Sequence, residues 1–255
     1  MNQNSSGFMS SIPVVTRNLL IINILVWLAQ FLLGRVIEID KYLALHFFES
    51  DLFMPHQIIT YMFLHDPSSP AHLFFNMFAV YMFGRTLEMV WGPKRYLVYY
   101  MLTGIGAAAL QMLITYIRVH SIEANMSAEA ISTVYNEGMG ILMSNRNYTD
   151  PDMGALNLLV NSSMVGASGA VFGVLVAFGM LFPNVELMML FLPIPIKAKW
   201  FVIGYGVIEL FLGIANSAGD NVAHFAHLGG LITGFFIILY WRNKGKANGH
   251  NFREY

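Results

Sequence analysis

"MVGASGAVFG" (Met164–Gly173) places one serine, Ser168, among glycines at the start of an apolar stretch that continues to Phe182. A hydroxyl group in such a place has to be explained, because a polar group away from water is stable only when it has a partner. The rest of the chain indicates which solvent surrounds this stretch and which side chain is that partner.

The composition predicts that the solvent is lipid. The chain has 255 residues, of which 56% are hydrophobic and 11% are charged, whereas a soluble domain has about 25% charged residues. The 14 Lys and Arg residues balance 15 Asp and Glu residues, so no nucleic-acid partner is indicated. The sequence contains no cysteine, which excludes disulfide and thiol chemistry.

Apolar windows predict six membrane crossings, because about 20 apolar residues are needed to cross the hydrocarbon layer. They are Val14–Gly34, Ala71–Trp91, Tyr96–Ile117, Ser168–Phe182, Trp200–Ala215 and Val222–Trp241. "ELMMLFLPIPIK" (Glu186–Lys197) is apolar too, but it contains prolines and follows Pro183. We interpret it as an interfacial loop, with a re-entrant hairpin as the alternative.

The fold class is therefore an all-α, polytopic six-transmembrane-helix bundle in one domain, residues 14–241. Short tails (1–13 and 242–255) flank it, and its sizeable loops outside the membrane are about 35–70 and 118–165. Basic residues gather in the tails and in the second and fourth loops: Arg17, Arg85, Lys94, Arg95, Lys197, Lys199, Arg242, Lys244, Lys246 and Arg253. The positive-inside rule then puts both termini in the cytoplasm. The short tails, with no signal or transit peptide, favour a bacterial inner membrane.

The partner predicted for Ser168 is His227. Counted from Phe182 and from Trp241, the two residues each lie about 21 Å from the inner end of their helix, at 1.5 Å per residue. Serine is a poor nucleophile until a base takes its proton, and a neutral imidazole within about 3 Å can do so. The pair therefore predicts acyl-transfer chemistry.

Small residues beside this pair predict that its two helices approach closely. Gly169 and Gly173 form one G-x-x-x-G motif, and Gly230 and Gly234 form another. Glycines four residues apart flatten a helix face. Such motifs also pack ordinary membrane helices, and this remains the alternative explanation.

Three further polar residues lie within the predicted crossings. His72 and Asn76 are four residues apart and share a helix face, so they are expected to face the interior, as oxyanion donors or as simple interhelical contacts. The backbone N–H of Ser168 is a third candidate donor. Glu209 is a conceivable carboxylate partner for the histidine, but it is expected near mid-membrane, below His227. We therefore interpret it as a structural acceptor between helices, with the partner role as the alternative. The prediction is therefore a Ser-His dyad.

Three motifs in order, "HLFFN" (72–76), "GASG" (166–169) and "AHFAHLGGLITG" (223–234), resemble those of the rhomboid intramembrane serine proteases. The resemblance extends from about Thr16 to Trp241. It implies that Ser168 is the nucleophile, that His227 is the general base and that His72 and Asn76 belong to the oxyanion hole. His224 belongs to the wider motif and is not the base. Residues expected to support the site are Gly166, Gly169, Phe172, Gly173 and Gly230.

The sequence departs from the family pattern in three places. Phe172 stands where some members have a tyrosine that stacks on the catalytic histidine. His56 and Gln57 stand where many members carry Trp-Arg, which puts the usual anchoring of the first loop in doubt. The third loop is unusually long.

The leading expectation is a serine endopeptidase that cleaves peptide bonds in or near transmembrane segments of other membrane proteins. By resemblance, its substrates are single-pass proteins whose helices open at small or helix-breaking residues. No metal or organic cofactor is implied. The alternatives are a non-catalytic rhomboid-like protein that binds membrane clients and, more remotely, a small transporter or channel.

Overall fold

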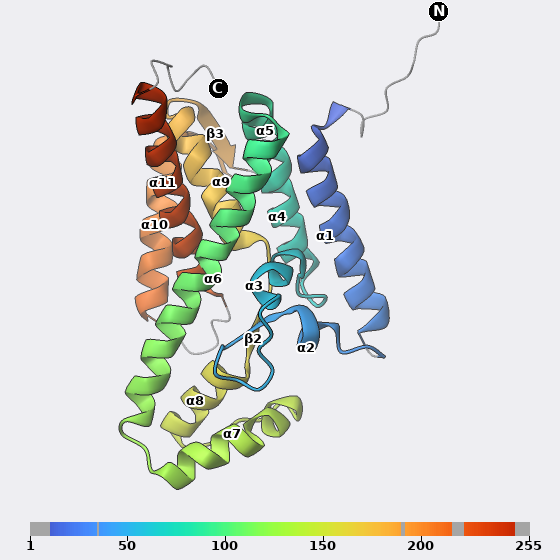
Figure 1. Ribbon diagram of the computed structural model, residues 1–255, viewed down its shortest axis with the longest axis vertical. Coiled ribbons are helices and arrows are strands. Elements are labelled where there is room, and N and C mark those ends of the chain that lie inside the picture. The colour runs from blue at the N-terminus through green and yellow to red at the C-terminus, as the bar shows by residue number, and fades with distance from the viewer. Residues whose placement is uncertain (1–10, 35, 190–191, 216–221, 248–255) are drawn as a thin grey trace, which may run out of the picture.

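Long helices packed side by side form the main body of the protein, and two shorter helices, α7 (Ala128–Met143) and α8 (Pro151–Asn161), lie at one end of it (Figure 1). The computed structural model describes residues 11–34, 36–189, 192–215 and 222–247. The tails predicted at 1–13 and 242–255 lie mostly outside the described residues, as do Arg35 and Arg253 of the predicted loops and tails.

Four of the described helices are long and apolar enough to cross a membrane, so the chain is a multi-pass membrane protein. They are α1 (Val14–Leu33), α6 (Pro93–Glu123), α10 (Ala198–Ala215) and α11 (His224–Ala247). The fourth predicted crossing corresponds to α9 (Ser168–Leu181), which is apolar but shorter. The second is divided into α4 (Pro70–Ala79), a π-helical segment η3 (Val80–Gly84) and α5 (Arg85–Trp91). The number of six crossings therefore stays a prediction.

The centre of the bundle is α9, whose residues from Gly169 to Gly179 are all buried. A helix that is apolar on every side is stable only inside a bundle, and α9 packs against α6, α10, α11 and η3. A Cβ placed on Gly230 would collide with the carbonyl oxygen of Gly169. The predicted close approach of these two helices is therefore confirmed. A Cβ on Gly173 would first meet Thr103 of α6, so this glycine allows α6 to pack closely against α9.

The third loop is folded, and α6 continues into it as far as Glu123, past the predicted end at Ile117. The extension is stable because the buried Val119 packs with Val134 of α7 and Leu156 of α8 in a small separate core. The length of this loop thus corresponds to a helical pair with its own apolar contacts.

The first loop contains α2 (Ile39–Leu43), β1 (Leu45–His46), α3 (Gln57–Thr60) and the 3₁₀ turn η2 (Tyr61–Phe63). Gln57 is fully buried; its Oε1 accepts from the backbone N–H groups of His46 (3.3 Å) and Met54 (3.1 Å), and its Nε2 donates to the carbonyl of Leu52 (3.0 Å). The anchoring of this loop, in doubt from the sequence, is thus made by a glutamine.

Two short strands connect this loop to the segment before Ser168. β1 pairs antiparallel with β2 (Ser163–Met164), and His46 lies opposite Ser163. The approach to the serine is therefore tied to the first loop.

The segment predicted as an interfacial loop is a β-hairpin. β3 (Glu186–Met189) pairs antiparallel with β4 (Leu192–Lys197), with Glu186 opposite Lys197. Prolines argue against a strand because they cannot donate to a neighbour, but an edge strand tolerates them. Among the described residues β4 pairs only with β3, so its other edge needs no N–H donors and accommodates the prolines.

Candidate active site

The turn before α9 presents Ser168 at the start of that helix. Gly166 has φ +127°, a conformation that strains any residue with a Cβ, and its N–H donates to the carbonyl of Tyr61 (3.0 Å). A Cβ on Gly166 would lie 3.0 Å from Nε2 of His72 and 3.6 Å from Oγ of Ser168. Glycine therefore permits the turn and leaves space between these two side chains.

Ser168 and His227 are brought together from α9 and α11. Oγ of Ser168 lies 2.8 Å from Nε2 of His227. When Nδ1 carries the proton of a neutral imidazole, Nε2 is an acceptor and the hydroxyl donates to it. The close approach at Gly169 and Gly230 is what allows this contact, since both glycines lie within one turn of the two polar residues.

Phe172 fixes the plane of the His227 ring. The two rings are stacked, with centroids 4.4 Å apart and an angle of 10° between planes. Phe172 also packs against Tyr205 of α10 at a centroid distance of 5.6 Å. The phenyl ring thus occupies the stacking position without a hydroxyl group.

Glu209 is in contact with two histidines, and the prediction that it lies below His227 is wrong. Its Oε2 is 2.6 Å from Nδ1 of His224 and 2.9 Å from Nδ1 of His227. The first contact is a hydrogen bond; in the second, the distance is short but the N–H is not well aligned. The depth count failed because it took Trp200 and Trp241 to lie at one depth. A Cβ on Gly206 would meet Leu231 and one on Gly213 would meet His224, so this part of α10 lies level with His227. The signal available in the sequence was a carboxylate within an apolar helix.

His72 and Asn76 both lie on α4. His72 faces Gly166, as the position of a Cβ there shows. The side-chain amide of the buried Asn76 donates to the backbone carbonyl of His72 at 3.1 Å, within its own helix. The backbone N–H of Ser168 lies in the first turn of α9, where N–H groups have no acceptor within the helix.

The donor atoms of Glu209, His224 and His227 lie within 4.8 Å of one another, which is close enough to consider a metal ion. Two ligand atoms on one tetrahedral zinc ion are separated by roughly 3.3 Å. The carboxylate oxygen is closer than that to both imidazoles, at 2.6 and 2.9 Å. The spacing therefore fits a cluster in which imidazole N–H groups face the carboxylate better than it fits a metal site.

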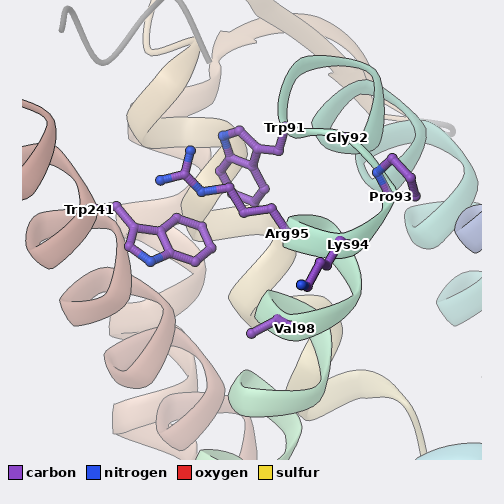
Figure 2. Close-up of a pocket in the computed structure, with 7 residues that line it drawn as sticks. All are labelled: Trp91, Gly92, Pro93, Lys94, Arg95, Val98 and Trp241. Carbon is purple, nitrogen blue, oxygen red and sulfur yellow. The ribbon is translucent and has the colours of Figure 1, made fainter.

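A hollow of about 400 Å³ lies away from Ser168 and contains none of the predicted site residues. Figure 2 shows it between α11 and the start of α6, with the guanidinium of Arg95 beside the rings of Trp91 and Trp241. The guanidinium carbon of Arg95 is 4.3 Å from the centroid of the Trp241 ring. Tryptophan with basic residues is typical of a membrane–water interface.

Comparison with known families gives one match. The family model described as a Rhomboid domain matches residues 53–244, a range that includes Ser168, His227 and the α4 residues. No match was found among curated proteins.

Proposed function

The chain belongs to the rhomboid family, and from this premise we propose that it is an intramembrane serine endopeptidase that cleaves peptide bonds in or near transmembrane segments of other proteins. The observation that carries the proposal is the 2.8 Å contact between Oγ of Ser168 and Nε2 of His227. Members of the family without activity generally lack one of these two residues, and this chain has both.

The proposed reaction has two halves, each with a proton transfer through His227. Oγ of Ser168 attacks the carbonyl carbon while Nε2 takes the hydroxyl proton. The C–N bond of the tetrahedral intermediate then breaks, and the proton passes to the leaving amine. A water molecule gives its proton to Nε2 and attacks the acyl-enzyme ester. The bond between the acyl carbon and Oγ then breaks, Nε2 returns the proton to Oγ of Ser168, and the new carboxyl group is released.

Negative charge develops on the substrate oxygen in both halves and needs donors aimed at it. The backbone N–H of Ser168 and the imidazole of His72 are the nearest candidates. Asn76 is a further candidate, because its Nδ2 uses one of its two N–H groups on the carbonyl of His72 at 3.1 Å and has a second one to donate.

We further propose six crossings with both termini in the cytoplasm of a bacterial inner membrane. In support, the start of α1 and the end of α11 lie at the same end of the molecule, opposite α7 and α8 (Figure 1). The basic, tryptophan-lined hollow of Figure 2 is at the start of α6, which fits a cytoplasmic interface. The active site is then reached from the outer side, where a single-pass substrate whose helix opens exposes an amide to water.

The test is labelling of the detergent-purified protein by a tagged fluorophosphonate, together with cleavage of a model single-pass substrate. We expect wild type to be labelled and to cleave, and both activities to vanish in Ser168→Ala and His227→Ala. A folded wild type that neither labels nor cleaves, but binds the substrate, would replace this proposal with client binding.

A further inference from the structure

Glu209 is a buried carboxylate that the Ser-His mechanism leaves unexplained. It lies in the middle of α10, an otherwise apolar helix, and is 6% exposed. A carboxylate taken out of water is costly unless hydrogen bonds or opposite charges compensate. Here one oxygen, Oε2, approaches two imidazoles at 2.6 and 2.9 Å, so its compensation comes from the histidines of α11.

The backbone of α10 and α11 holds this carboxylate against the histidines. A Cβ on Gly213, one turn after Glu209, would lie 3.2 Å from Cβ of His224. A Cβ on Gly206, one turn before it, would lie 3.0 Å from Leu231. Glu209 thus lies on the face of α10 where small residues allow a close approach to α11.

The oxygen near Nδ1 favours one tautomer of His227, although the N–H there is not well aligned with it. Nε2 can accept the proton of Ser168 only when Nδ1 carries the ring hydrogen. A carboxylate accepts and does not donate, so an oxygen 2.9 Å from Nδ1 favours that tautomer. The same negative charge stabilises the imidazolium that forms when Nε2 takes the proton.

We infer that Glu209 is a positioning residue of this site, third in a Ser168–His227–Glu209 relay, and that His224 keeps its carboxylate in place. The inference rests on the proposed protease function. His224 meets the requirement because its hydrogen bond of 2.6 Å to Oε2 is the shorter of the two contacts.

The experiment compares Glu209→Gln with a matched control, Glu88→Gln. Glu88 is also a buried carboxylate, but it accepts from the backbone N–H and hydroxyl of Thr16, both at 2.7 Å, and joins α5 to α1 away from the serine. For each variant, kcat and KM for the model substrate, the rate of fluorophosphonate labelling and the Tm are measured.

We expect Glu209→Gln to lower kcat and the labelling rate together by about 100-fold, the scale of a lost proton-transfer contribution, with KM within about twofold of wild type. Glu88→Gln should lower Tm and leave kcat unchanged. A folded Glu209→Gln variant with the kcat of wild type would overturn the inference. So would a Glu209→Gln variant whose kcat falls no further than that of Glu88→Gln when the two variants lose the same amount of Tm.

If Glu209→Gln does not fold, the same measurements are made on Glu209→Asp. Shortening the side chain by one methylene draws the carboxylate back from Nδ1, so kcat should fall while KM is kept, and wild-type kcat would overturn the inference. These outcomes differ from a failure of the proposed function, in which the wild type itself shows no labelling and no cleavage.

Discussion

His65 is a fully buried imidazole in the loop before α4, and its nitrogens have no hydrogen-bond partner among the described residues. Burial lowers the pKa of His65 to about 3, and the neighbouring His72, with its ring centroid 5.1 Å away, also lowers it. In the unfolded chain a histidine has a pKa of about 6.5. Between these pH values the unfolded state binds a proton that the folded state does not. The titration of His65 therefore costs no stability above about pH 6.5, and it lowers the free energy of unfolding increasingly as the pH falls.

Lowering the pH from 7 to 5 should therefore cost about 2 kcal/mol through His65 alone. The measurement is the Tm in detergent at both pH values for wild type and for His65→Leu, which cannot titrate. The variant should lose less stability than wild type between the two values, whatever its own Tm at pH 7. An identical pH dependence in the two proteins would contradict the assignment of this proton to His65.

At the scale of helices, the packing of α9 against α11 depends on Gly230. Gly230→Leu would drive its side chain into the backbone of Gly169 and separate Ser168 from His227. We expect substrate cleavage to fall by at least about 100-fold, since both proton transfers need the contact, while the protein still inserts into the membrane. The matched control is Gly204→Leu, because a Cβ on Gly204 meets nothing within 4 Å. Equal cleavage in the two variants would remove the packing argument.

The same helices show what a sequence can predict about such a site. The apolar windows and the G-x-x-x-G spacing are local patterns, so α1, α9 and the approach at Gly230 could be predicted from them. The contact of Glu209 with His227 depends on the position of α10 along α11, which no local pattern encodes. The β3–β4 hairpin was missed because its prolines resemble those of a loop, and the α7–α8 pair because its small core forms only when α6 extends beyond the predicted crossing.

The whole molecule has two chemically different ends. One carries α7 and α8; the other carries the hollow lined by Lys94, Arg95 and two tryptophans (Figures 1 and 2). Lipid surrounds a helix bundle without selecting its direction, so the orientation that we propose rests on the asymmetry of basic residues at the two ends. With Ser168 at the start of α9, this orientation also decides from which side water and substrate enter.

The orientation can be tested directly, because the chain contains no cysteine and any introduced thiol is unique. Ser144, in the third loop, and Lys94, at the opposite end, are both exposed positions. In intact spheroplasts a membrane-impermeant maleimide should label Ser144→Cys, whereas Lys94→Cys should be labelled only after the membrane is opened. Labelling of both variants after solubilisation controls for thiol reactivity. The reverse pattern would put the third loop in the cytoplasm and require substrates to reach Ser168 from that side.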